Sequence, residues 1–157
     1  MTKVKRILKW LLLAAVIVVV VMQFFGPKRT NPTAEASLAL ESHAQVPANV
    51  KAVLDRSCAD CHSNNTRWPW YSRVAPVSWF VIDHVNDGRE QLNLSEWGRY
   101  DKRQQSHNLD DMCELATEGD MPLSSYTPLH PGSKPTADDI KILCDWTNAE
   151  QARLALR

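Results

Sequence analysis

The sequence predicts an all-α domain preceded by a single N-terminal transmembrane helix. Apolar residues recur at helical spacing in four stretches, and no stretch shows the alternation typical of a strand. A run of 19 residues, 7–25, is apolar except at Lys9 and Gln23. We therefore divide the 157 residues into an anchor over 1–25, a tether over 26–47 and a helical domain over 48–157.

The apolar run matches the length of about 20 residues with which a helix crosses a membrane. Basic residues (KVKR) precede the run, and residues 1–29 contain six Lys or Arg and no acid. This charge bias predicts a single-pass inner-membrane protein whose helical domain is exported to the periplasm. A cleaved signal peptide is the alternative, although the one small-x-small site, Ala34-Glu35-Ala36, lies far beyond the run.

The segment between the anchor and the domain contains three prolines and many small polar residues, which is typical of a tether. We expect a short helix in it around residues 34–40. From residue 30 onward the chain has 12 basic and 18 acidic residues. Because this part repels phosphate, we expect no nucleic-acid partner. The net negative charge of this part is compatible with a basic protein partner. The sequence does not identify the redox partners.

Four helices are expected in the domain, over residues 48–61, 77–86, 101–118 and 137–153. Gly88 and Gly119 are the expected stops of the second and third, and Thr136 with Asp139 resembles a capping box before the fourth. The loops 63–76 and 119–136 are long for a small domain and rich in proline and aromatic residues. Such loops usually need something to wrap around.

The chemistry is indicated by the sequence Cys58-Ala59-Asp60-Cys61-His62. Two thiols at this spacing can form thioethers with haem, and the adjacent histidine is then held beneath the iron as its ligand. A zinc site would need a second cysteine pair, and a thioredoxin-like site would need a βαβ context. Both of these alternatives fit the sequence poorly.

Two further segments carry a resemblance to a known family. The segment CADCHSNNTRWPWYSRVAPVSWFVIDHVNDGREQLNLSEW, residues 58–97, and GDMPLSSYTPLHPGSKPTADDIKILCDW after it, resemble the small bacterial haem-binding domain family built around C-x-x-C-H-S-N-x-T-x-W-P-W-Y. The resemblance covers roughly residues 45–152. It implies a membrane-anchored c-type cytochrome domain with a cytochrome c-like helical fold and one covalent haem c per chain.

The sixth ligand of the iron is expected to be Met121, in the loop EGDMPLSSY. Small c-type cytochromes present a distal sulfur in a Met-Pro sequence about sixty residues after the haem motif, and this chain resembles them there. Met112 belongs to an apolar helix face and is expected in the core. His84, on the apolar face of the second helix, is the competing ligand, and His130 is the weaker one. The solvated histidines are expected to be His43 and His107.

The haem contacts are expected in the aromatic segment that follows the motif. Aromatic rings can bury a porphyrin, and indole, phenol and guanidinium groups can bind its propionates. The candidates are Trp68, Trp70, Tyr71 and Arg73, with Arg89 and Tyr126 as weaker ones.

Cys113 and Cys144 occupy matching places on two inward helix faces. In an oxidising compartment they could form a disulfide, and they could equally be small buried thiols. The sequence does not decide between these states.

Together these observations predict an electron carrier with a single covalent haem, and not an enzyme. The alternative is a haem-based sensor or a peroxidase-like enzyme with a displaceable distal ligand, in which His84 would be the group to follow.

Overall fold

The computed structural model describes residues 3–156, which form helices and no strand, so the all-α prediction is confirmed. The α-helices are α1 (Lys3–Met22), α2 (Leu40–His43), α3 (Ala48–Ser57), α4 (Ala59–His62), α5 (Val77–Gln91), α6 (Lys102–Glu118) and α7 (Ala137–Ala155). Short 3-10 helices are η1 (Ala36–Leu38), η2 (Trp70–Arg73), η3 (Leu94–Arg99) and η4 (Thr127–Leu129).

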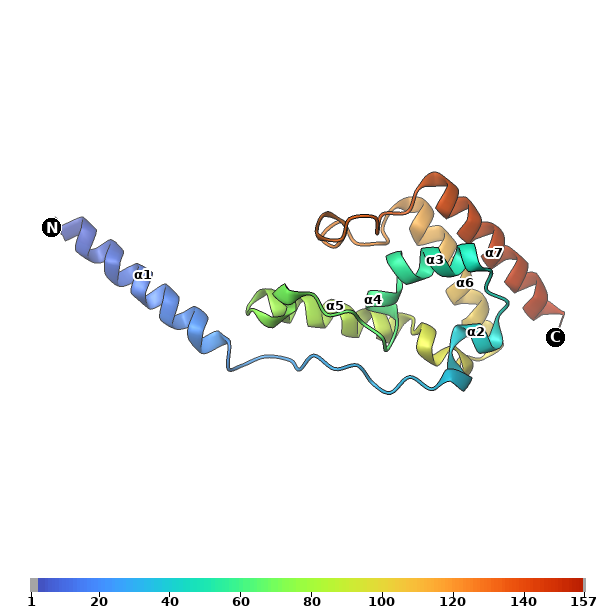
Figure 1. Cartoon of the computed structure of the whole chain (residues 1–157), viewed down its shortest axis with the longest axis horizontal. Coiled ribbons are helices and arrows are strands. Elements are labelled where there is room, and N and C mark those ends of the chain that lie inside the picture. Colours follow the sequence, from blue (N-terminus) through green and yellow to red (C-terminus); the bar gives the residue numbers. More distant parts are fainter. Residues whose placement is uncertain (1–2, 157) are drawn as a thin grey trace.

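Helix α1 projects away from the other helices (Figure 1). Over residues 3–156, no helix combines the length and the apolar character needed to cross a membrane. The predicted transmembrane anchor over residues 1–25 is therefore wrong, and so is the single-pass inner-membrane location with a periplasmic domain that depended on it. The physical reason is that α1 ends at Met22 and includes four cationic residues: Lys3, Lys5, Arg6 and Lys9.

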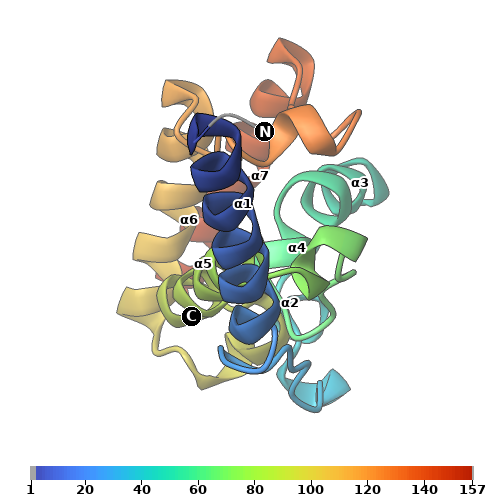
Figure 2. The same ribbon diagram turned by 90° about the vertical axis from the view of Figure 1, so that its left-hand side faces the viewer.

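The core of the domain lies where α6 and α3 pack against α7. Viewed along the length of the molecule, α6 and α3 lie on opposite sides (Figure 2). The buried core residues are Leu40, Val50, Leu54, Leu94, Trp97, Leu109, Met112, Ala116, Leu143, Trp146 and Leu154. Met112 is thus a core residue, as its place on an apolar helix face predicted. Since burial of one such side chain contributes about 1.5–3 kcal/mol, this cluster supplies much of the driving force for folding.

The ends of α6 and α7 follow their sequence signals. Asp101 and Gln104 form a capping box at the start of α6, and Thr136 and Asp139 form one at the start of α7. Helix α6 ends at Gly119, whose φ of 81° is a left-handed conformation that favours glycine. A disulfide between Cys113 and Cys144 joins α6 to α7, which settles the question that the sequence left open.

Two helices differ from their expected extents. One carries the cysteine motif, and the other contacts it. The expected helix 48–61 breaks at Cys58, so that α3 ends at Ser57 and a separate short helix, α4, carries the second cysteine. Helix α5 does not stop at Gly88 but continues to Gln91. Gly88 is needed there because a Cβ atom would lie 2.9 Å from the carbonyl oxygen of Cys61. Glycine therefore lets α4 and α5 pack backbone against backbone.

The segment expected to be a tether is held against the domain at several points. Leu40 is 2% exposed and belongs to the core. Before it, residues 23–33, which we call the strap, run beside the segment that follows the cysteine motif. The side chain of Gln23 exchanges two hydrogen bonds with the backbone of Ala75, at 2.9 and 3.2 Å. Asn31 accepts a hydrogen bond from Trp68 Nε1 at 3.0 Å.

Candidate functional site

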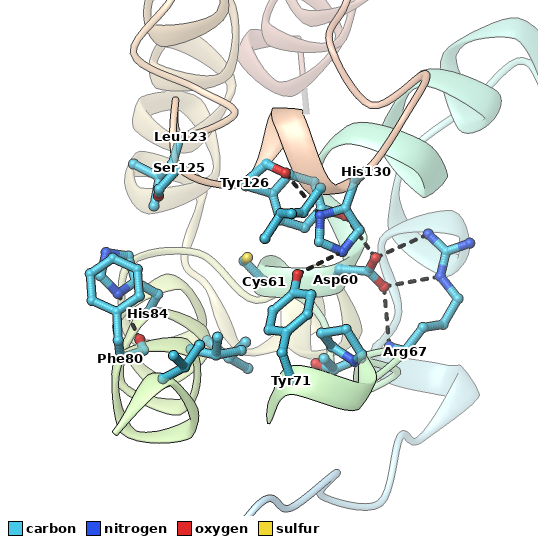
Figure 3. Close-up of a pocket in the computed structure, with 16 residues that line it drawn as sticks. Asp60, Cys61, Arg67, Tyr71, Phe80, His84, Leu123, Ser125, Tyr126 and His130 are labelled. Carbon is cyan, nitrogen blue, oxygen red and sulfur yellow. Dashed lines mark hydrogen bonds and ion pairs between the residues drawn. The ribbon is translucent and has the colours of Figure 1, made fainter. Parts of the chain in front are cut away.

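A cleft of about 140 Å³, partly open to solvent, lies beside the cysteine motif. Its floor comes from α4 and the facing side of α5, and its opposite wall comes from the loop 123–130 (Figure 3). Cys61 of the motif lines this cleft, and its sulfur is drawn in yellow near the middle of the view. The lining is mainly apolar or aromatic and includes Pro69, Tyr71, Val77, Phe80, Val81, Val85, Leu123, Tyr126 and Leu129.

The imidazole of His62 is fixed from one side by the backbone of α5 and its C-terminal end. Its Nδ1 lies 2.8 Å from the carbonyl oxygen of Gly88 and 3.1 Å from that of Leu92. Because both neighbours are acceptors, Nδ1 carries the proton and donates, which leaves Nε2 as the nitrogen with a free lone pair. Burial lowers the pKa of His62 against the opposing effect of these two bonds, which favours the neutral imidazole that binds metals.

The two thiols of the motif are in surroundings that suppress their ionisation. Burial raises the pKa of Cys58 to about 12 and that of Cys61 to about 11. Disulfide exchange requires a thiolate with a lowered pKa, so these surroundings argue against a redox-exchange site. Within residues 3–156, no cluster of three or more His, Cys, Asp or Glu side chains is placed to hold a metal ion, which argues against a structural zinc site.

The residue between the cysteines, Asp60, links the motif to both flanking loops. It is 9% exposed and accepts hydrogen bonds from the backbone N–H and Nε of Arg67, at 3.1 and 3.0 Å. Its other oxygen accepts from the hydroxyl of Tyr126 at 2.8 Å. A buried carboxylate is stable only when it is paired and hydrogen-bonded in this way. Burial and this hydrogen bond raise the pKa of Tyr126, so its hydroxyl stays protonated and remains a donor.

A second set of contacts closes one end of the cleft. The hydroxyl of Tyr71 lies 3.2 Å from Nε2 of His130, and Nδ1 of His130 lies 2.9 Å from the carbonyl oxygen of Tyr126 (Figure 3). The carbonyl requires a donor, so Nδ1 carries the proton and Nε2 accepts from Tyr71. The rings of Tyr126 and His130 stack with centroids 3.7 Å apart. These contacts hold η2 and the loop 123–130 together.

The candidate distal ligands occupy different places. Met121 is 37% exposed and is not among the cleft residues, although Leu123, two positions later, is one of them. His84 lines the cleft. Its Nδ1 lies 2.8 Å from the carbonyl oxygen of Phe80, which makes Nδ1 the donor. Among residues 3–156, Nε2 of His84 has no hydrogen-bond partner. The sequence-predicted pair His62 and Met121 is therefore not brought together at the cleft.

The other predicted haem contacts are divided between the cleft and the strap. Tyr71 lines the cleft, whereas Trp70 is 76% exposed and lines only an adjoining hollow. Trp68 binds the strap through Asn31, and Arg73 is exposed and lines neither space. Arg89 donates hydrogen bonds to Ser63, Thr66, Thr30 and Asn31, and so joins the strap to the motif.

Three residues that position the site were missed by the sequence analysis: Asp60, Arg67 and Gly88. A signal for Asp60 was present, because an acid within a motif that points inward needs a partner, and Arg67 is the nearest following cation. Gly88 was interpreted as a helix stop. Its role as a contact point follows from the close approach of α5 to α4 in the structure.

These residues fit a haem group. A flat apolar ring needs an apolar slot, a thiol at its rim and an imidazole with a free nitrogen. The cleft provides Phe80, Val81 and similar side chains, with Cys61 among its lining residues. His62 follows Cys61 directly in the chain, although it is not itself a lining residue. Phe80 and Leu129 line the cleft yet are 52% and 60% exposed, so their surfaces face the open space. A ring in the cleft would cover them.

The family model described as a haem-binding domain matches residues 17–149. This match covers most of the chain, so the chain belongs to that haem-binding domain family. No curated protein and no solved structure matches the chain.

Proposed function

We propose that this member of the haem-binding domain family holds one haem covalently, as a c-type haem, and carries single electrons. The thiols of Cys58 and Cys61 form the two thioether bonds, and Nε2 of His62 is an iron ligand. The bound group supplies a one-electron couple at its iron. The chain's own residues bind, orient and partly shield that group, and no catalytic residue is required of them.

The observation that carries this proposal is the orientation of His62. An imidazole whose Nδ1 donates to two backbone carbonyls presents Nε2 in a fixed direction. Hydrogen bonding at Nδ1 also raises the basicity of Nε2, which stabilises the oxidised iron and lowers the reduction potential. Gly88 supplies one of these carbonyls and also contacts Cys61, so the ligand and the covalent link share one support.

We propose that Met121 would be the second protein ligand of the iron, besides His62. The loop that begins at Gly119 and carries Met121 forms the wall of the cleft facing α4 and α5, through Leu123, Ser125 and Tyr126. Met121 itself is 37% exposed and is not a lining residue, so its side chain would have to turn toward the cleft to bind the iron. Thioether and imidazole ligation raises the potential and leaves no position open to small ligands, which suits electron transfer.

An acidic surface favours a basic redox partner, since residues 30–157 contain 12 basic and 18 acidic residues. We expect electron transfer to such a partner to slow as salt is added, because screening weakens the attraction between opposite charges.

Absorption spectra of the purified chain, produced in cells that mature c-type cytochromes, test this proposal. The proposal predicts a c-type α band in the reduced protein and a weak methionine–iron charge-transfer band in the oxidised protein. The charge-transfer band should disappear in Met121→Ala and persist in Met112→Leu, which changes the core methionine. A chain without haem absorbance contradicts the haem assignment, and a Met121→Ala spectrum equal to that of the wild type contradicts the ligand assignment.

The second candidate function is a haem-based sensor or a peroxidase-like enzyme. It is favoured by His84, which lines the cleft and whose Nε2 has no partner in the described part of the chain, while Met121 lies partly exposed. In this case His84 would act as an exchangeable ligand or as an acid–base group. Rapid binding of carbon monoxide to the reduced wild type, altered in His84→Ala, supports this candidate. Inertness to carbon monoxide supports the electron carrier.

A further inference from the structure

The imidazole of His62 has two acceptors, and the second of them lies just beyond the end of α5. Leu92 leaves the helix in an extended conformation, with φ −147° and ψ 125°, and its carbonyl oxygen lies 3.1 Å from Nδ1 of His62. The carbonyl of Gly88 lies within the helix, so the helix itself fixes its direction. The carbonyl of Leu92 lies in the turn between α5 and η3, so other contacts must fix its direction.

The peptide between Leu92 and Asn93 is bonded on both of its sides. In a trans peptide such as this one, the C=O and the N–H point in opposite directions. The C=O accepts from His62, while the N–H of Asn93 donates to the hydroxyl oxygen of Tyr100 at 2.8 Å. A peptide whose N–H is engaged has a more polarised carbonyl, which is a better acceptor. Tyr100 therefore supports both the orientation and the strength of the bond to His62.

The side chain of Asn93 holds the same turn from a second direction. Its Oδ1 accepts from the backbone N–H of Ser95 at 3.0 Å, so its Nδ2 is the group that faces Asn64. This Nδ2 donates to Oδ1 of Asn64 at 2.8 Å, and the backbone N–H of Asn64 donates to Oγ of Ser95 at 3.0 Å. Asn64 is 1% exposed and Asn93 is 7% exposed. Because a buried amide costs free energy unless it is bonded, the loss of either partner should disturb the other.

Asn64 follows His62 by two positions, so these bonds join the same two short segments twice. The segment 62–64 contributes the imidazole donor and the Asn64 acceptor. The segment 92–95 contributes the Leu92 acceptor and the Asn93 donor. Two such bonds fix the separation and the register of the segments. A displacement of Asn93 therefore displaces the carbonyl that accepts from His62.

We propose that Asn64, Asn93 and Tyr100 are positioning residues for His62, and that they set how strongly Nδ1 of its imidazole is hydrogen-bonded. The inference rests on the proposed function, in which Nε2 of His62 binds the iron. None of the three lines the cleft, so they are placed to act through the imidazole and not on the bound group. Hydrogen bonding at Nδ1 makes Nε2 a stronger donor, which stabilises the oxidised iron. Loosening of this peptide should therefore raise the midpoint potential.

The test is the midpoint potential of the haem-loaded full chain in Asn93→Ser, Asn64→Ala and Tyr100→Phe. Serine can still cap η3 but cannot reach Asn64, and phenylalanine keeps the ring that packs edge-on against Trp97. Changes at groups that orient a metal-binding histidine commonly alter affinity by about 10–100-fold. We expect the preference for oxidised iron to fall about tenfold in both asparagine variants, which is a rise of about 59 mV for a one-electron couple. Tyr100→Phe should raise the potential less.

A double-variant cycle shows whether the two asparagines act through their shared bond. The double variant should then have the potential of either single variant, because the bond is lost only once. The second measurement is the solvent exchange of the His62 ring N–H, followed by NMR in the reduced protein. Because a weaker hydrogen bond opens more often, this exchange should be faster in all of these variants than in the wild type.

Two controls separate positioning from loss of stability. Asn65→Ala changes an exposed side chain of the segment that follows the motif, and it should match the wild type in potential and in ring N–H exchange. Leu154→Ala removes a core side chain from α7. It should lower the melting temperature while the potential stays at the wild-type value.

Potentials of Asn93→Ser and Tyr100→Phe that equal the wild type, or that rise no further than that of Leu154→Ala, overturn the inference. Rises that add in the double variant also overturn it, because they show that Asn64 and Asn93 act separately. Where an asparagine variant fails to accumulate, Tyr100→Phe decides. A wild-type chain that carries no haem defeats the proposed function itself, whereas haem with unchanged potentials and unchanged ring N–H exchange defeats only this inference.

Discussion

Replacement of Gly88 by alanine tests how the ligand and the covalent link are supported. The added Cβ would lie 2.9 Å from the Cys61 carbonyl oxygen and 3.2 Å from the Cys61 Cβ. The carbonyl is backbone and cannot rotate away, so α4 and α5 must separate. Overpacking of this kind costs about 1–3 kcal/mol.

The overpacking is partly offset by the better helix propensity of alanine, about 1 kcal/mol inside a helix. We therefore expect Gly88→Ala to destabilise the chain by about 1 kcal/mol, which lowers the melting temperature by about 2–4 °C at this chain length. Asn86→Ala is the matched control, because Asn86 is exposed on the same helix and gains propensity without a clash. It should melt at or slightly above the wild-type temperature.

The same substitution also displaces the carbonyl that accepts from His62 at 2.8 Å. A weaker hydrogen bond makes Nε2 a poorer donor to the iron, so the midpoint potential should rise. Thermal melts and redox titrations of the two variants measure both effects. A Gly88→Ala chain that is more stable than the wild type, with an unchanged potential, would refute the reasoning.

Three further perturbations have defined outcomes. Arg56 and the cap of α7 lower the pKa of Asp139 to about 2, so the free energy of unfolding should fall as the pH drops from about 4 to about 2. In Asp139→Asn this acid-dependent loss of stability should be smaller by about 1–2 kcal/mol, as measured by thermal melts at acid pH. Replacing both Cys113 and Cys144 by alanine should cost about 3–4 kcal/mol in urea titrations, because the disulfide closes a loop of 31 residues. Asn31→Ala removes hydrogen bonds to the segment after the motif and should hasten proteolysis within the strap, measured by limited digestion.

Each of these expectations has its control. The sign for Asp139 follows from linkage: a carboxyl with a lowered pKa stabilises the fold above the pKa of its unfolded state and stops doing so as it is protonated. Asp138→Asn, in the same turn, should keep the wild-type acid profile. The disulfide-free variant should be insensitive to reductant, unlike the wild type. Equal digestion of Asn31→Ala and Asn65→Ala would show that the strap is not held by Asn31.

Local patterns predicted the helices of the domain well. The stripe that includes Leu109 and Met112, the stop at Gly119 and the capping box at Thr136 are all properties of neighbouring residues, and the structure confirms them. The cysteine motif likewise indicated haem, and the chain belongs to a haem-binding family.

The missed features depend on contacts between distant segments. No local pattern shows that Gly88 faces Cys61 or that Asn31 binds Trp68. The same holds for Tyr71 and His130, which are 59 positions apart yet close one end of the cleft. The transmembrane prediction failed for another reason, because it counted apolar residues over 7–25 while the helix begins among the cations at Lys3.

The central claim is tested most directly by the mass of the denatured full-length chain, produced in cells that mature c-type cytochromes. The account predicts a mass increased by one haem group that survives denaturation and organic extraction, and an unmodified mass when Cys58 and Cys61 are both alanine. An unmodified wild-type chain, or haem that extraction removes, would contradict it.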